Sequence, residues 1–280
     1  MKAVITAAGR GTRLLPTTKQ LPKEMLPIFH RLGPDKIETK PLLQLIFEQL
    51  FDIGIREFCF IVGREKRAIE DHFTPDEQYL EDLQASCKNP SFNSLKAFYS
   101  KLDESTILWA NQPSPRGFGD AVLYGEPFVG DDPFIVHAGD TYVPSFRDKY
   151  SNLLMTEVIE NGADASLLLH KVENPSSYGV AILHSEDQVS KVVRVVEKPE
   201  RPLSNLAIMP IYAFSPSIFN ALKGCQLGVG NEIQLTDGIQ RLIEGGSKVC
   251  AITMEEREKV FDVGSPESYW IALKNSYVGW

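Results

Sequence analysis

The sequence predicts an α/β fold: an open sheet, mixed but mostly parallel, with helices on both faces. Two observations predict it. Through the first half of the 280 residues, short apolar runs rich in β-branched side chains alternate with segments whose apolar residues recur at helical spacing, which is typical of parallel strands joined by crossover helices. In addition, the first apolar run, residues 2–7, passes directly into a loop of small residues, as strands of such sheets do at a ligand-binding edge.

The first half is predicted to contain four buried strands. Pro41 starts the first long helix, whose apolar residues recur at helical spacing until Gly54 stops it. Residues 29–39 are polar and are expected to form an irregular excursion, and residues 79–101 to form surface helices interrupted at Asn89. The strands are expected over residues 2–7, 57–62, 106–110 and 133–137, and the other helices over 65–72 and, as a short helix, after residue 122.

The second half changes character and is expected to pair partly antiparallel. Two apolar runs, residues 180–184 and 189–197, follow each other closely enough to form a hairpin-like pair. Further strands are expected over residues 165–170, 206–214 and 248–254, and helices over 150–161, 217–223, 234–244 and 266–277. With no internal repeat and enough length for a large core, we expect a single domain over residues 1–280.

Composition and charge narrow the class of protein. The net charge of −8 and the pI near 5.3 argue against binding to nucleic acid or an anionic membrane, because both select a basic surface. No apolar run approaches the roughly 20 residues of a membrane span, and the N-terminal run is too short for a secretory signal. The cysteines form no CxxC pair, which favours buried thiols in a reducing compartment. We therefore expect a cytoplasmic protein.

The loop from Ala8 to Arg13 is suited to a polyphosphate. Gly9 and Gly11 can adopt positive φ and allow backbone N–H groups to approach an anion, while Arg10 and Arg13 add positive charge. A plain tight turn is the alternative. The dinucleotide fingerprint requires a third glycine where this chain has leucine, which disfavours a nicotinamide oxidoreductase, and the Gly-Lys-Ser/Thr of the Walker loop is absent.

Asp140 follows the strand predicted over residues 133–137. The carboxyl ends of parallel strands share the ligand-binding edge of an open sheet, so we expect Asp140 to lie near the glycine loop. A turn or helix cap is the alternative role for this aspartate.

Three segments together resemble the sugar-1-phosphate nucleotidylyltransferases, and within that family the UTP:glucose-1-phosphate uridylyltransferases. They read AAGRGTR over residues 7–13, LPKEMLPI over 21–28 and KPLLQ over 40–44. The run NEIQLTD, residues 231–237, is similar to the same branch, although Asn231 could simply cap a helix. Residues 112–115, QPSP, look more like the glucose-1-phosphate thymidylyltransferases, which leaves UTP and dTTP as alternatives.

The resemblance implies a Rossmann-like nucleotide-diphospho-sugar transferase fold and a Mg²⁺-dependent transfer. The expected reaction joins UTP and glucose 1-phosphate into UDP-glucose and pyrophosphate, with residues about 1–145 binding nucleotide and about 146–280 binding sugar phosphate. A homo-oligomer, dimer or tetramer, is also expected. The alternative from another class is a nucleotide-sugar-binding sensor without turnover.

The resemblance also assigns roles to individual residues. Gln112 carries one acceptor and two donors, which can pair with N3–H and O4 of a uracil-type ring. The attacking phosphate has a second pKa near 6 and needs no general base, so the absence of a Ser-His-Asp pattern is consistent with this chemistry. The implied set is Ala8, Gly9, Gly11, Thr12, Gln112 and Gly117 for the nucleotide, Arg13 and Lys23 for its phosphates, Gly179, Glu197 and Lys198 for the sugar phosphate, and Asp140 and Asp262 for Mg²⁺.

Overall fold

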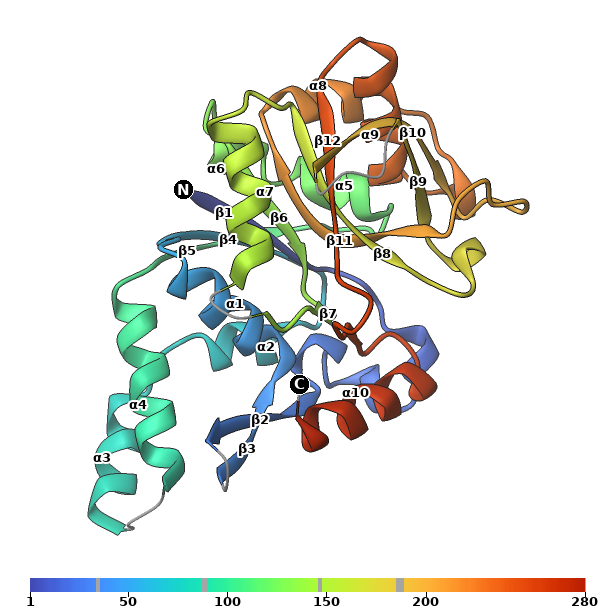
Figure 1. Ribbon diagram of the computed structural model, residues 1–280. Coiled ribbons are helices and arrows are strands. Elements are labelled where there is room, and N and C mark those ends of the chain that lie inside the picture. The colour runs from blue at the N-terminus through green and yellow to red at the C-terminus, as the bar shows by residue number, and fades with distance from the viewer. Residues whose placement is uncertain (34–35, 87–89, 146–147, 185–188, 280) are drawn as a thin grey trace.

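A computed structural model describes residues 1–33, 36–86, 90–145, 148–184 and 189–279. Within them a nine-stranded sheet has the order β5-β4-β1-β6-β11-β8-β12-β10-β9; Figure 1 shows it with α3, α4, α10 and the β2–β3 hairpin extending to one side of it. Its strands are β1 Lys2–Ala7, β4 Glu57–Val62, β5 Thr106–Asn111, β6 Phe134–Ala138, β8 Ala165–Lys171, β9 Gly179–Leu183, β10 Val189–Glu197, β11 Leu206–Phe214 and β12 Val249–Thr253. The strands predicted from the sequence are thus confirmed, and the fold class with them.

Strand direction changes between the two halves of the sheet. Strands β5, β4, β1 and β6 are parallel to one another. Strand β11 then lies antiparallel to both β6 and β8 and joins the halves. Beyond it β8 and β12 are parallel, whereas β10 is antiparallel to β12 and β9. The mixed pairing expected of the second half is therefore confirmed.

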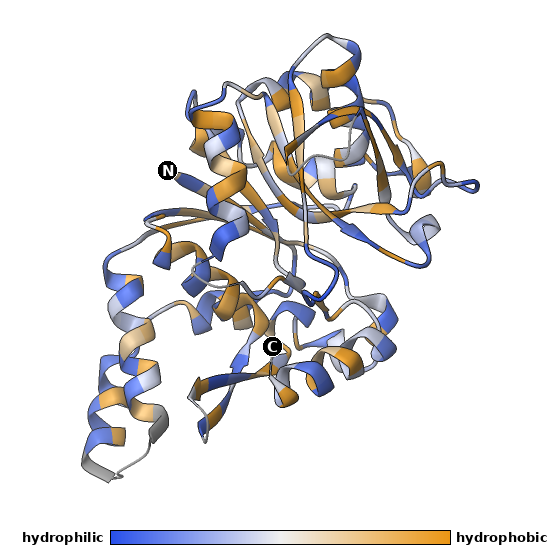
Figure 2. Cartoon of the chain, in the orientation of Figure 1, coloured by the Kyte–Doolittle hydropathy of each residue, from blue (hydrophilic) through white to orange (hydrophobic). Residues whose placement is uncertain are grey.

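Helices cover both faces of the sheet, because side chains along each strand alternate in direction. Ala3 and Ile5 of β1 belong to one core with α1 and α4, whereas Val4 belongs to the other core with α5, α8 and α9. Figure 2 shows apolar segments along the strands and polar ones in the outer loops. The helices are α1 Leu42–Asp52, α2 Arg67–His72, α3 Glu77–Ser86, α4 Pro90–Asp103, α5 Phe118–Leu123, α6 Glu126–Val129, α7 Lys149–Ile159, α8 Ser217–Lys223, α9 Leu235–Glu244 and α10 Pro266–Val278.

The prediction of an irregular excursion over residues 29–39 is wrong. Strands β2 Pro27–Gly33 and β3 Lys36–Pro41 form an antiparallel hairpin, which lies beside α10 in Figure 1. Its position is fixed by the distant helix: the Phe29 ring contacts Tyr277 edge-on at 5.1 Å between centroids, and Phe29 N–H donates to Ser276 Oγ at 3.2 Å. A polar hairpin of this kind is stabilised by a partner that local sequence does not reveal.

Of the two predicted surface helices, the one over residues 90–103 is partly buried in the core. Helices α3 and α4 extend away from the sheet as a pair in Figure 1, but Phe98 of α4 is fully buried and contacts Phe47 of α1 edge-on at 5.9 Å between ring centroids. The predicted break at Asn89, like the thiol of Cys87, lies outside the described residues. No helix in the described ranges has the length and apolar character needed to cross a bilayer.

Candidate active site

The glycine loop, residues 8–13, follows β1, and the segment that contains Lys23 lies beside it. Gly11 has φ of 63° and opens a short 3₁₀ turn, Thr12–Leu14. Thr18 Oγ1 donates to the Gly11 carbonyl at 2.7 Å and holds the next turn against it. A Cβ on Gly9 would lie 3.6 Å from Lys23 Nζ, so the lysine ammonium lies directly beside the loop. The predicted cradle and its predicted lysine are therefore adjacent.

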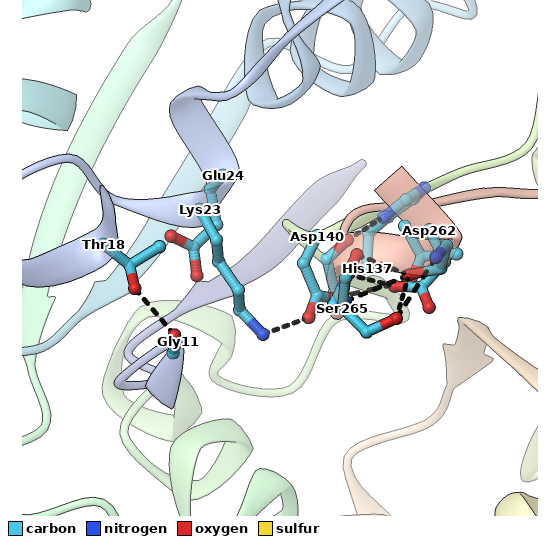
Figure 3. A network of polar contacts seen from close by, with 12 residues as sticks. Gly11, Thr18, Lys23, Glu24, His137, Asp140, Asp262 and Ser265 are labelled. Atoms are coloured by element: carbon cyan, nitrogen blue, oxygen red, sulfur yellow. Dashed lines mark hydrogen bonds and ion pairs between the residues drawn. The ribbon is translucent and has the colours of Figure 1, made fainter. Parts of the chain in front are cut away.

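Lys23 forms an ion pair with Asp140, drawn in Figure 3. Burial alone would lower the pKa of Lys23, but the carboxylates of Asp140 and Glu24 outweigh it and raise that pKa. Burial alone would likewise raise the pKa of Asp140, but the ammonium beside it lowers it. Both groups are therefore charged at neutral pH.

Asp262 lies next to Asp140 because two short strands bring them together. In the ladder between β13, Phe261–Asp262, and β7, Thr141–Tyr142, Asp262 is opposite Thr141, and Val263 N–H donates to the Asp140 carbonyl at 3.0 Å. Burial and then the charge of Asp140 raise the pKa of Asp262. Two acidic groups from distant parts of the chain thus lie side by side in a partly buried position, as expected.

These two carboxylates suit a hard divalent cation. Mg²⁺ is usually held by one or two carboxylates, with substrate phosphates and water completing its shell. Across the described ranges, no three His, Cys, Asp or Glu side chains gather as a metal site, so a metal here would depend on Asp140, Asp262 and the phosphates. The guanidinium of Arg13 also lies near Asp262. A Cβ on Gly264 would lie 3.0 Å from Arg13 Nη2 and 2.9 Å from Asp262 Oδ1.

A cavity of about 570 Å³ lies on the nucleotide side of Asp140. It is lined by the predicted nucleotide residues, namely Ala8, Gly9, Gly11, Thr12, Gln112 and Gly117. The side-chain amide of Gln112 donates to Asp120 Oδ2 at 2.7 Å and to the Gly117 carbonyl at 3.3 Å. The expected donation from this amide to a base O4 is therefore not met, because both hydrogens are engaged within the protein.

A second cavity of about 530 Å³ lies on the other side of Asp140 and contains the predicted sugar-phosphate residues, Gly179, Glu197 and Lys198. A Cβ on Gly179 would approach Thr236 Oγ1 to 2.9 Å and Glu197 Oε2 to 3.1 Å, so a side chain there would displace these two groups. Lys198 Nζ lies 3.3 Å from Glu197 Oε1, with the lysine half exposed. The salt bridge is thus present within the cavity that a sugar phosphate would enter.

Sequence reasoning missed a buried ion pair beneath the loop. Lys66 Nζ donates to Glu24 Oε2 at 2.8 Å, and both residues are buried. Lys66 and Arg64 line a neighbouring cavity with Arg10 and Lys19. The sequence could have indicated that Lys66 lies near the glycine loop. Residues 63–66 follow β4, which is parallel to β1 and ends at the same edge of the sheet.

The role suggested for Asn231 as a helix cap is wrong. Helix α9 begins at Leu235 with Gln234 at its N-cap position, and Asn231 lies in a separate 3₁₀ turn with φ of 60°. The segment instead packs against the loop that carries Gly117: Ile233 N–H donates to the Arg116 carbonyl at 2.8 Å.

Comparison with known proteins identifies the family of the chain. A family model described as nucleotidyl transferase matches residues 2–277. The chain belongs to the nucleotidyl transferase family. One relative in the family, the UTP--glucose-1-phosphate uridylyltransferase of Bacillus subtilis, is 37% identical over 268 residues, which cover 94% of this chain and 86% of the relative.

Solved structures are similar over almost the whole chain. A structure described as UDP-glucose pyrophosphorylase complexed with UDP-glucose has a TM-score of 0.82 and 31% identity, covering 99% of this chain and 98% of that one. The UTP-bound UGPase from Acinetobacter baumannii has a TM-score of 0.81 and 25% identity, covering 98% and 92%. The nucleotidyl transferase fold inferred from the sequence is thereby confirmed.

Proposed function

We propose that this chain transfers a uridylyl group from UTP to glucose 1-phosphate and releases pyrophosphate, with Mg²⁺ held by Asp140 and Asp262. One observation carries the proposal. Lys23 and Asp140 line both cavities, so they lie where a triphosphate in one cavity would meet a sugar phosphate in the other. The names of the relatives supply the substrates: uridylyltransferase for the sequence relative, and UDP-glucose and UTP in the solved structures.

The residues present suit this chemistry. An oxygen of the sugar phosphate attacks the α-phosphorus of UTP, the bond to the α–β bridging oxygen breaks, and pyrophosphate leaves with that oxygen. Positive charge must stabilise both phosphates and hold them in line; Arg13, Lys23 and Lys198 provide it. Mg²⁺, when bound, adds charge neutralisation at the triphosphate. His137, buried beside the site with its pKa lowered by burial to about 4, stays neutral and is not a general acid.

One experiment distinguishes the uridylyltransferase from its two alternatives, a thymidylyltransferase and a nucleotide-sugar sensor without turnover. Pyrophosphate release is measured with UTP and dTTP, each with glucose, galactose and N-acetylglucosamine 1-phosphates, with Mg²⁺ and with EDTA. We expect UTP with glucose 1-phosphate to give the highest kcat/KM, and EDTA to abolish it. Faster turnover with dTTP would support the thymidylyl alternative suggested by residues 112–115. No release with any pair would overturn the proposal and favour the sensor.

We further propose a homo-oligomer in the cytoplasm. Helix α10 exposes four large apolar side chains: Trp270, Ile271, Tyr277 and Val278. Such a surface favours association with another copy. The described cysteines, Cys59, Cys225 and Cys250, are free thiols, which is consistent with a reducing compartment.

A further inference from the structure

Asp120 lies behind Gln112 and does not line either cavity that Gln112 faces. It belongs to the first turn of α5 and is 5% exposed, while Gln112 is 4% exposed. Its two oxygens have different partners. Oδ2 accepts from the Gln112 amide at 2.7 Å, and Oδ1 lies 3.5 Å from Nε of Arg116, whose charge faces the carboxylate from solvent.

This contact determines which way round the Gln112 amide lies. The oxygen and nitrogen of a glutamine amide are assigned from their partners, and a carboxylate can only accept hydrogen bonds. The NH₂ group must therefore face Asp120. Its other hydrogen is directed to the Gly117 carbonyl at 3.3 Å, so neither donor is available to a ligand.

Only the amide oxygen of Gln112 remains for the base. Within the described part of the chain, Oε1 has no hydrogen-bond partner, and the residue lines the nucleotide cavity. A lone acceptor requires an N–H donor on the ligand. Uracil and thymine carry that donor at N3, whereas N3 of cytosine is itself an acceptor and would leave two acceptors facing each other.

We propose that Asp120 is a positioning residue for base selection, which orients Gln112 so that the site accepts imide pyrimidines and rejects cytosine. The inference rests on the proposed function, since it assumes that the cavity lined by Gln112 holds the base. It goes beyond that function because it names a residue that touches no substrate and a base class that the site excludes. It does not separate UTP from dTTP, which share N3–H.

The test compares UTP with CTP in three proteins: the wild type, Asp120→Asn, and the matched control Asp131→Asn, which removes the same charge at an exposed position on another loop. In Asp120→Asn the new side chain can offer either its oxygen or its NH₂ to Gln112, so the glutamine amide is free to turn. We expect the ratio of kcat/KM for UTP over CTP to fall about tenfold or more in Asp120→Asn, mainly through KM. Asp131→Asn should keep the wild-type ratio.

A purely structural role would give another result, because a distorted pocket lowers both rates together and leaves the ratio unchanged. That outcome would overturn the inference. The exchanged pair Gln112→Glu/Asp120→Asn places a carboxylate, which offers only acceptors, at position 112, and it should restore the preference for UTP over CTP. If the pair instead keeps the relaxed ratio of Asp120→Asn, the inference is also overturned.

Two further measurements separate this inference from the proposed function. If neither the wild type nor the variants release pyrophosphate with any nucleotide, the proposed function fails. Equilibrium titration of the same proteins with UTP and CTP then still measures whether Asp120→Asn changes the preference between the two bases. If Asp120→Asn does not fold, 3-methyl-UTP is compared with UTP on the wild type. We expect the methylated base, which lacks N3–H, to bind about tenfold more weakly or worse, and equal binding would overturn the inference.

Discussion

The two aspartates proposed to hold Mg²⁺ differ in their surroundings but are expected to be equally necessary. Asp140 is balanced by Lys23, whereas Asp262 is held by the Gly264 N–H at 2.7 Å. We expect Asp140→Asn and Asp262→Asn each to lower kcat by about two orders of magnitude or more, because losing one preorganised electrostatic contact costs roughly 3–4 kcal/mol. Steady-state pyrophosphate release measures this, with Asp131→Asn as control. Wild-type turnover in either variant would remove that residue from the metal site.

Asp148 is a buried acid whose charge is expected to destabilise the protein. It is 4% exposed, has φ of 44°, and accepts from Gln49 Nε2 at 3.0 Å. Burial raises its pKa from 3.8 to about 6. The native state therefore binds the carboxyl proton of Asp148 more tightly than the unfolded chain does. The stability that this bound proton contributes is complete below about pH 4 and is lost as the pH rises through 6.

Asp148→Asn removes this pH dependence while keeping a residue suited to both positive φ and helix capping. At pH 7.5 we expect the variant to be more stable than the wild type by about 3 kcal/mol, and at pH 4 to be equal to it. Urea unfolding at the two pH values measures the difference. An equal or lower stability at pH 7.5 would contradict the argument.

Between elements, the contact of the Gly117 loop with the segment before α9 leaves no space for a side chain. Gly117 has φ of 111°, and a Cβ there would lie 2.5 Å from the Ile233 carbonyl oxygen. Gly130 also has positive φ, 62°, but a Cβ there would meet nothing within 4 Å. Gly130→Ala should cost only the backbone term of about 1–3 kcal/mol, because its φ and its ψ of −127° are rarely adopted by residues other than glycine.

We expect Gly117→Ala to cost clearly more than Gly130→Ala and to raise the KM for UTP, because the displaced loop lines the nucleotide cavity. Thermal unfolding and initial rates of the two variants measure both effects. The steric argument fails if the two substitutions prove equivalent in stability and in KM.

The Lys66–Glu24 pair connects the loop after β4 to the segment that carries Lys23. Lys66→Met leaves a buried carboxylate without its partner, which typically costs about 3–5 kcal/mol. Lys101→Met is the matched control, because its partner Asp52 is largely exposed and such pairs contribute about 1 kcal/mol or less. Urea unfolding at neutral pH compares them, and adding Glu24→Gln to Lys66→Met should recover part of the loss. Similar costs for the two lysines would show that Glu24 is not effectively buried.

The local sequence predicted the individual helices and strands better than the contacts between segments that are far apart in the chain. The strand ends and glycine loop could be predicted because a strand followed by Gly9 or by Asp140 is a local pattern and parallel strands share an edge. The β2–β3 hairpin was missed because its position depends on contacts of Phe29 with α10, more than two hundred positions later in the chain. Asp120 was missed for a similar reason: its role depends on how α5 packs behind Gln112, and no spacing in the sequence signals it.

At the scale of the whole molecule, the apolar surface of α10 predicts association. Trp270 and Ile271 are 65% and 53% exposed, which is unfavourable for a monomer in water. We expect light scattering after gel filtration to give a dimer or tetramer, and Trp270→Glu/Ile271→Glu to give a smaller species of unchanged secondary structure. A monomeric wild type, or a double variant of unchanged mass, would contradict this interface.

The place of β11 in the sheet has a consequence for biosynthesis. Its hydrogen bonds cover the edge of β6, yet the chain delivers β11 only after α7, β8, β9 and β10. A nascent chain emerging from the ribosome can assemble β5, β4, β1 and β6 first, and until β11 arrives that partial sheet ends in an unpaired strand open to other chains. The interval between translation of these two strands is therefore when we expect this protein to depend most on chaperones.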